Sequence, residues 1–293
     1  MRWHGTSPSE GNSVSGSASG SVTERWVGSL RAYLGILRAQ LRTVSHFRAN
    51  LLAWVLYSPL QLGVVYLLWA IVYRSTDDVG GFGFDDMILY YLLVHLLRRI
   101  FGPLLWINVE VWQEINEGKL DIYLARPIRF GPFVFCRSLA APLLEIALGV
   151  PFFLVFLVLL GLPIQKDPAL WVAFLASAAA GYALLFLVQF LIGLLTFWME
   201  RIFGIRDIVF SVFMLFSGQL IPISVLPTWA TRVSAFLPFE GIYYIPAKIF
   251  ALPEAGPEVA LLLLQQVVWI ALLWALAAAV WTRGVRRYAS QGG

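Results

Sequence analysis

The sequence predicts an all-α polytopic membrane protein with six transmembrane helices. The first observation behind this fold class is composition: the 293 residues are 59% hydrophobic and only 13% charged, whereas a soluble domain carries about 25% charged residues. The second is a series of long apolar runs with few or no charges. The third is a content of 12 Trp, 11 Tyr and 21 Phe, which suits a chain that lines two membrane–water interfaces.

Six apolar runs account for the predicted spans. A membrane helix needs about 20 apolar residues to cross the hydrocarbon layer. The only charges inside the six runs are Arg98, Arg99 and Glu145. Helices are expected because the alternating pattern of a β-barrel is absent and open sheets are excluded from lipid. The expected spans are 50–73, 87–109, 138–165, 168–199, 208–223 and 259–282.

The distribution of Lys and Arg predicts the orientation of the spans. With the N-terminus inside, the inner segments hold fifteen of these residues and the outer segments hold four. This bias follows the positive-inside rule and predicts that both termini lie in the cytoplasm. The basic residues lie in separate loops rather than on one face, so no nucleic-acid partner is expected.

The chain before the first span divides into two parts. Residues 1–23 are rich in Gly and Ser and predict a disordered cytoplasmic tail rather than a signal peptide. Residues 24–49 predict a basic amphipathic helix, with an apolar stripe that begins at Leu30 and Leu34. We expect this helix to lie at the inner membrane surface, or alternatively to pack on a partner protein. The remaining divisions are a transmembrane domain, 50–285, and a cytoplasmic C-terminal tail, 286–293.

The inner loop at 108–131 carries an acidic pattern. On a helix, carboxylates at steps of four, three and four residues would share one face. Gly118 is expected to break or bend this helix, and Arg126 to end it, because Pro127 follows. The segment either docks on a partner protein or forms a solvated loop helix. The four acidic residues are Glu110, Glu114, Glu117 and Asp121.

The outer segment at 217–250 is too apolar for a loop in water. Its four prolines exclude one straight helix. Irregular backbone at membrane depth is tolerated only inside protein or beside a cavity. We therefore expect short helices that form an outer re-entrant helical hairpin. The prolines are Pro222, Pro227, Pro238 and Pro246.

The sequence contains no recognisable nucleotide or metal site. A P-loop requires G-x-x-x-x-G-K-[ST]. The only Gly-Lys pair, at Gly118, is followed by Leu120, and Gln113 stands where the first glycine should be. The three histidines are scattered, and no nucleophile–base spacing is visible. We expect this chain to be no enzyme by itself and to bind no cofactor.

On these two segments the chain resembles permeases of the ABC-2 type, over residues 25–290. The likeness is closest to the bacterial branch in which two permease chains often accompany one ATPase gene. The inner motif runs from Ile115 through Glu117, Gly118, Lys119, Leu120 and Asp121 to Leu124, Arg126 and Pro127. The outer motif contains Phe216, Ser217, Gly218, Pro222, Leu226, Pro227, Trp229, Leu237, Pro238, Phe239, Tyr243 and Pro246.

The resemblance implies a transmembrane subunit of an ABC transporter that works by alternating access. ATP and Mg would bind to partner ATPase subunits, and a second permease chain, the same or homologous, would complete the path. Residues 24–49 would be a connecting helix that also contacts the ATPase. The implied ATPase-coupling residues are Glu114, Glu117, Gly118, Lys119, Leu120, Asp121 and Arg126. The outer segment would close the path, and its implied gate residues are Ser217, Gly218, Pro222, Pro227, Trp229, Pro238, Phe239 and Tyr243.

The charges inside the spans have three possible roles. A charge near mid-bilayer costs several kcal/mol unless it is paired or hydrated. Arg98 and Arg99 in the second span could reach the depth of Glu145 in the third, because adjacent spans are antiparallel. They could form a structural ion pair, line a hydrated substrate vestibule or relay protons.

The leading functional prediction is a permease that exports an amphipathic or lipid-like compound and contacts membrane lipids. One alternative is a membrane-embedded lipid-modifying enzyme, for which only Arg98, Arg99 and Glu145 offer a polar constellation. The other is a structural subunit of another membrane complex. An ATPase partner with Walker motifs would favour the permease.

Overall fold

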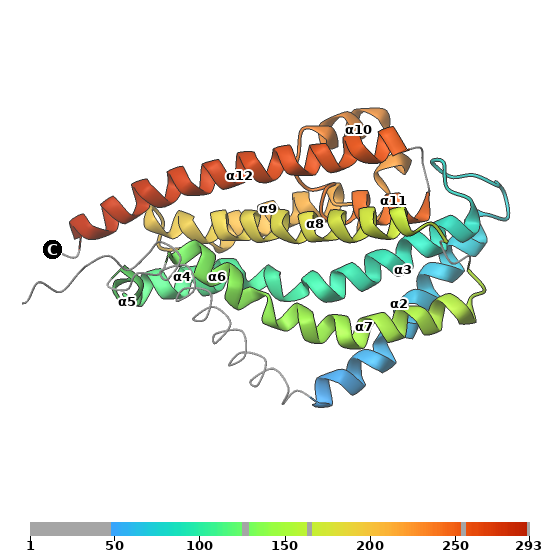
Figure 1. Ribbon diagram of the computed structural model, residues 1–293, viewed down its shortest axis with the longest axis horizontal. Coiled ribbons are helices and arrows are strands. Elements are labelled where there is room, and N and C mark those ends of the chain that lie inside the picture. Colours follow the sequence, from blue (N-terminus) through green and yellow to red (C-terminus); the bar gives the residue numbers. More distant parts are fainter. Residues whose placement is uncertain (1–47, 125–128, 163–165, 253–255, 292–293) are drawn as a thin grey trace, which may run out of the picture.

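The computed structural model describes residues 48–124, 129–162, 166–252 and 256–291, and these residues form helices and short connections without a β-strand (Figure 1). The predicted tail at 1–23 and nearly all of the predicted helix at 24–49 lie outside the described residues. In chain order the helices are α2 (Arg48–Val72), α3 (Phe84–Phe101), η1 (Gly102–Trp106), α4 (Ile107–Asn116), α5 (Leu120–Leu124), α6 (Phe130–Ser138), α7 (Ala140–Leu159), α8 (Pro168–Leu194), η2 (Leu195–Phe197), α9 (Phe203–Phe216), η3 (Ile223–Val225), α10 (Thr228–Ala235), α11 (Tyr244–Ala251) and α12 (Gly256–Gln291).

Four helical stretches in the described part of the chain are long and apolar enough to cross a membrane. They are Phe84–Asn116, Phe130–Leu159, Pro168–Phe197 and Pro257–Tyr288. A shorter apolar helix covers Tyr57–Val72 of α2, and α9 has 14 residues. The prediction of a helical membrane protein is confirmed, and the total of six spans stays a prediction.

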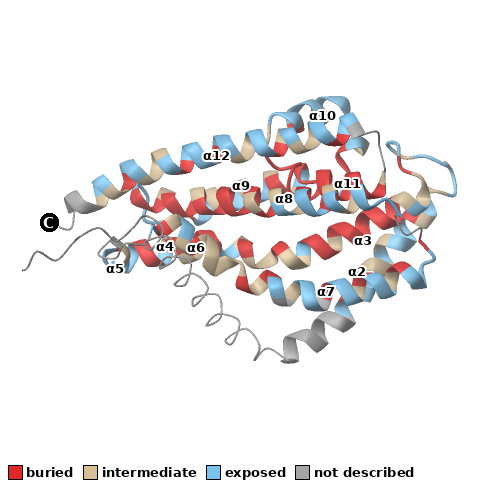
Figure 2. Ribbon diagram, in the orientation of Figure 1, coloured by how far each residue is buried: buried red, intermediate tan, exposed pale blue. Residues whose placement is uncertain are grey.

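Helices α3 and α8 lie at the centre of the bundle, and α2, α7 and α12 lie around them (Figures 1 and 2). Helix α3 packs against α2, α7 and α11, and α8 packs against α4, α11 and α12. The outer helices expose large apolar side chains, among them Leu60, Val158, Leu159 and Leu261. Such a surface is unfavourable in water but is matched by lipid tails.

Small residues on α8 allow its neighbours to approach closely. A Cβ at Gly181 would lie 2.6 Å from the carbonyl oxygen of Ile242, and one at Gly193 would lie 2.7 Å from the Cβ of Val111. Any larger side chain would push these segments apart. Helix α8 therefore packs closely against both the inner helix α4 and the backbone before α11.

Two elements end at places that the sequence analysis did not predict. Helix α9 stops at Phe216, short of the predicted end at 223, because Gly218 has a φ of +78° and Pro222 follows it. A left-handed glycine and a proline both end a right-handed helix. Helix α12 continues to Gln291, so 286–291 extend that helix and are not a tail.

The two segments with candidate functions lie at opposite ends of the molecule. Helices α4 and α5 and the C-terminal end of α12 lie at one end, and α10 and α11 lie at the other (Figure 1). Helix α3 runs between these ends and continues through η1 into α4. A single helical stretch therefore links the two candidate sites.

Candidate coupling and translocation sites

A turn at Gly118 separates α4 from α5. Gly118 has a φ of +70°, in the left-handed region that favours glycine. The amide of Lys119 donates a hydrogen bond to the carbonyl oxygen of Glu114 at 3.0 Å. Leu120 then begins α5 and is fully buried, which anchors the turn to the bundle. The break predicted at Gly118 is confirmed.

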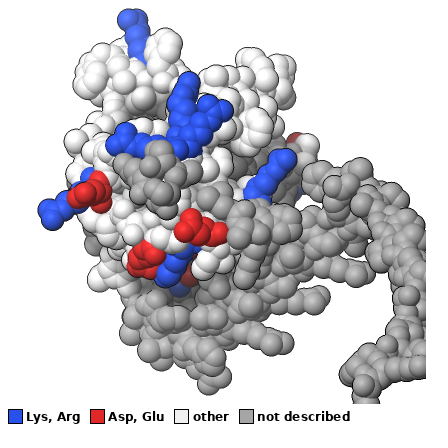
Figure 3. All heavy atoms as spheres, turned by 90° about the vertical axis from the view of Figure 1, so that its left-hand side faces the viewer, with Lys and Arg blue, Asp and Glu red and all other residues white. Residues whose placement is uncertain are grey.

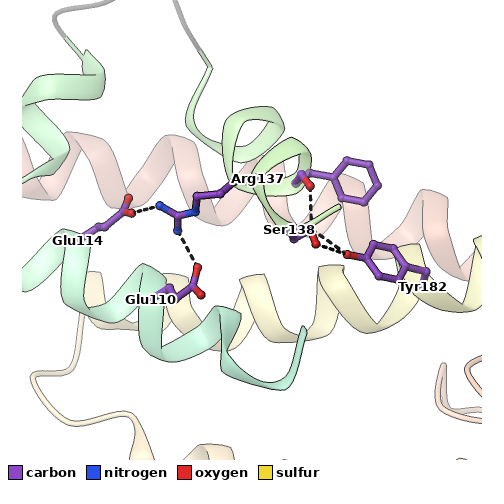
Figure 4. Close-up of polar contacts among 6 residues, drawn as sticks. Glu110, Glu114, Arg137, Ser138 and Tyr182 are labelled. Atoms are coloured by element: carbon purple, nitrogen blue, oxygen red, sulfur yellow. Dashed lines mark hydrogen bonds and ion pairs between the residues drawn. The ribbon is translucent and has the colours of Figure 1, made fainter. Parts of the chain in front are cut away.

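The guanidinium of Arg137 joins α4 to α6 (Figure 4). Its Nη1 donates to Oε1 of Glu114 at 2.5 Å, and its Nη2 donates to Oε2 of Glu110 at 2.7 Å. Glu114 is buried, with 9% of its surface exposed, and a charge in such a place needs a partner. Burial and the nearby Glu114 carboxylate also raise the pKa of Tyr123. Two residues of the predicted acidic face are therefore occupied by internal contacts.

The exposed part of this segment is formed by Glu117, Lys119 and Asp121. Nζ of Lys119 lies 2.5 Å from Oε2 of Glu117, and both side chains are at least half exposed. The Glu117 carboxylate raises the pKa of Lys119 through a hydrogen bond and its charge. Asp121 lies next to the phenol of Tyr288 in α12. Arg126, the last predicted coupling residue, lies outside the described residues.

Two further hydrogen bonds fix the inner end to the bundle. Nε1 of Trp112 donates to the carbonyl oxygen of Glu200 at 2.8 Å, in the connection before α9. The hydroxyl of Tyr182 in α8 donates to the carbonyl oxygen of Ser138 at 3.0 Å (Figure 4). Seen along the long axis, this end exposes both basic and acidic side chains (Figure 3). It therefore offers a partner mixed charges rather than one uniformly basic or acidic face.

The outer segment is held to α3 by tyrosine hydroxyls. Tyr90 donates to the carbonyl oxygen of Gly218 at 2.6 Å, and Tyr91 donates to that of Leu220 at 2.7 Å. A Cβ at Gly218 would lie 2.6 Å from the hydroxyl oxygen of Tyr90. The backbone at 218–220, which lies beyond the end of α9, thus obtains partners from a buried helix, as membrane burial requires.

Most of the predicted gate residues are inside the protein. Tyr243 stacks on Phe101, with ring centroids 5.7 Å apart. The sequence analysis missed Glu240, a buried carboxylate that accepts a hydrogen bond from Ser234 at 2.8 Å and another from Gln265. Among the predicted residues, Ser217, Gly218, Pro222, Pro238, Phe239 and Tyr243 are buried, whereas Pro227 and Trp229 are exposed.

The intramembrane charges separate into a pair and a single residue. Nε of Arg99 lies 2.5 Å from Oε2 of Glu145, and both side chains are less than a fifth exposed. This contact joins α3 to α7. Arg98 is exposed on a different face of α3 and lines a cavity instead. Of the three roles considered for these charges, the structural ion pair describes Arg99 and Glu145, and it does not describe Arg98.

The family described as ABC-2 family transporter protein matches residues 60–292, which is most of the chain. The chain belongs to the ABC-2 family of transporters. No curated protein matches its sequence. Members of this family are membrane components of ABC transporters that have no nucleotide site of their own and work with ABC ATPase subunits. The chain is therefore a multi-pass membrane permease subunit.

The permease also contains an apolar cavity of about 740 Å³ between α6, α8 and α12. Its walls are mostly aromatic and small apolar side chains, including Phe130, Phe190 and Trp281, with Arg129 at one side. The volume lies within the roughly 300–1,000 Å³ of typical ligand sites. The sequence analysis missed this cavity because its walls come from helices that are far apart in the chain.

Proposed function

We propose that this permease is a transmembrane subunit of an exporter, in which a separate ATPase drives alternating access for an amphipathic or lipid-like compound. The observation that carries the proposal is the inner end of the bundle. There, the turn at 117–121, in which Glu117, Lys119 and Asp121 are exposed, lies beside a partly buried ion-pair network that joins α4 to α6. Movement of the turn by an ATPase would thus reach both helices.

The proposed route of coupling runs through α4 and α6. The ATPase would contact Glu117, Lys119 and Asp121, which are exposed. Because Arg137 binds Glu110 and Glu114 together, a displacement of α4 would also displace α6. Helix α4 continues into the stretch that carries α3, and α3 holds the outer segment. This connection supports the proposal that movement at the inner end is transmitted to the outer segment.

The proposed topology has six spans in a bacterial inner membrane, with both termini in the cytoplasm. Helices α2 and α9 would add two spans to the four long apolar helices, with α10 and α11 in the outer leaflet. The proposed partners are an ABC ATPase, a second permease chain and membrane lipids. The cavity of about 740 Å³ between α6, α8 and α12 supports an amphipathic cargo, because its walls are apolar and Arg129 is basic.

Purification of the full-length permease from its native membrane tests the proposal. We expect an ATPase with Walker motifs to co-purify, and the two proteins together to hydrolyse ATP in vesicles. Asp121→Lys should reduce the co-purified ATPase about tenfold, because one lost charge contact at an interface is worth roughly 1.4 kcal/mol or more. Asp77→Lys, at an exposed site in the outer loop, should not.

Two outcomes would contradict the proposal. If the permease purifies without an ATPase, the proposed drive by a stably bound ATPase is wrong. If Asp121→Lys retains as much ATPase as Asp77→Lys does, the turn at 117–121 is not the contact.

A further inference from the structure

A second cavity, of about 360 Å³, lies between α2, α3 and the outer segment. Helix α3 contributes Tyr91, His95 and Arg98, which are spaced four and three residues apart and so share one helix face. The outer segment contributes Gln219, and α2 contributes Gln61 and four apolar side chains. Among the residues that the structure describes, no acidic side chain lines this cavity.

Three side chains in this cavity that can donate hydrogen bonds have polar atoms without partners within the described part of the chain. Arg98 forms no hydrogen bond or ion pair there, in contrast to its neighbour Arg99. Nε2 of His95 is buried without a partner. Gln219 is 7% exposed, and its side chain makes no hydrogen bond to a described residue. Unpaired donors at membrane depth are unfavourable, so their concentration in one cavity points to a ligand.

The chemistry of these groups selects the class of ligand. A guanidinium, an amide N–H and an imidazole N–H all donate hydrogen bonds, and carboxylates and phosphates accept them. The apolar wall from α2, including Leu60 and Val64, suits an alkyl chain. We propose that this cavity binds the anionic group of an amphipathic ligand, with Arg98 as its charge partner and His95 and Gln219 as hydrogen-bond donors.

The position of the cavity relates it to the outer gate. The hydroxyl of Tyr91, which lines the cavity, donates to the carbonyl oxygen of Leu220 in the outer segment. Gln219 lies in the same segment, so a ligand bound to it would contact the backbone that is proposed to close the path. The role of the cavity in transport rests on the proposed function, whereas binding of the anion does not.

Photo-crosslinking of the full-length permease in phosphatidylcholine nanodiscs tests binding. The probes are diazirine-labelled dodecanoic acid and its methyl ester, which differ only in the anionic group. We expect the acid to label peptides around 60–65, 91–98 and 219–220 at about tenfold lower concentration than the ester does. Arg98→Gln should remove this preference, and Arg98→Lys should retain part of it. Arg232→Gln, at an exposed arginine of α10, should behave as the wild type.

Gel filtration and thermal unfolding show whether Arg98→Gln folds. If it does not, a second variant provides the test. Gln219→Leu leaves the charge of the protein unchanged and should weaken labelling by the acid about tenfold, because one hydrogen bond to the anionic group is lost. Equal labelling by acid and ester in the wild type would refute the anion site, as would a normal preference in a folded Arg98→Gln variant.

Two further conditions identify the source of the anion. If the natural ligand is an anionic lipid, phosphatidylglycerol in the nanodiscs will compete with the acid in the wild type. If it is a transported solute, ATP and the partner ATPase will move the acid across vesicle membranes. A preference for the acid without ATP-driven movement would leave the anion site intact and argue against the proposed export. ATP-driven movement of the ester alone would support export and refute the anion site.

Discussion

Arg137 and Arg206 both pair with carboxylates but in different surroundings. Arg137 is 19% exposed and binds two residues of another helix, one of which is the buried Glu114. Arg206 is 28% exposed and contacts its neighbour Asp207, which is 66% exposed. Because water already stabilises an exposed pair, only the first arrangement leaves a stranded charge when the arginine is removed.

Arg137→Gln is expected to lower the free energy of unfolding by about 2–3 kcal/mol, somewhat less than a fully buried pair would lose. Arg206→Gln should cost about 0–1 kcal/mol. Thermal unfolding of both purified variants in the same detergent measures the difference. The double change Arg137→Gln with Glu114→Gln should recover part of the loss, because the carboxylate that remains, that of Glu110, is 43% exposed and stays in contact with water. Equal losses for the two single variants would rule out the buried network.

The sequence predicted the depth of the charged residues but not their pairing, for a geometrical reason. The depth of Arg98, Arg99 and Glu145 could be estimated from their positions in the spans. Adjacent residues on a helix point about 100° apart, and only packing decides which arginine meets Glu145. Arg137 lies 23 and 27 residues from its two partners, with the turn at Gly118 between them, and no periodic pattern connects them.

Helix α8 is the element on which the inner end depends. Its Gly193 faces α4 so closely that a Cβ would lie 2.7 Å from the Cβ of Val111 and 3.1 Å from the carbonyl oxygen of Asn108. The side chain of Asn108 also donates to Gln189 of α8 at 2.5 Å. Movement of α4 along α8 would therefore break this buried hydrogen bond unless both side chains moved together.

Gly193→Ala should destabilise the permease by about 1–3 kcal/mol, because an extra methyl group in a tight contact forces the backbones apart. It should also reduce ATP hydrolysis by the complex, since α4 carries the turn that would meet the ATPase. The control is Gly204→Ala in α9, where a Cβ meets nothing within 4 Å and alanine favours the helix. Thermal unfolding and ATPase assays on both variants decide this, and an unaffected Gly193→Ala variant would show that the contact tolerates expansion.

The elements were predicted best where a local signal marked their ends. The start predicted at 168 agrees with α8, since Asp167 caps the helix and Pro168 occupies its first position. The turn at Gly118 was likewise marked by its glycine. The span at 208–223 was predicted too long, because apolar composition extends past Gly218 and does not distinguish a spanning helix from a re-entrant segment. The separate helix α6 carried no such mark.

At the scale of the whole molecule, the proposed orientation can be tested with single cysteines in a Cys136→Ser background. In intact cells an impermeant maleimide should label Asp77→Cys and Arg232→Cys, which are exposed in the outer segments. Glu117→Cys and Arg286→Cys should react only after the membrane is opened. Labelling of Glu117→Cys in intact cells would reverse the orientation. Labelling of residue 77 but not 232 would contradict six spans.

The extension of α12 to Gln291 affects how this protein can be handled. Tyr288 lies next to Asp121, and its hydroxyl oxygen would be 3.9 Å from a Cβ at Gly118, so this part of α12 lies beside the turn at 117–121. An affinity tag or fluorescent protein fused closely to this part of α12 would lie near the surface where an ATPase is proposed to bind. Such a fusion could purify well and yet be inactive, and a long spacer after the last helical residue would separate these two effects.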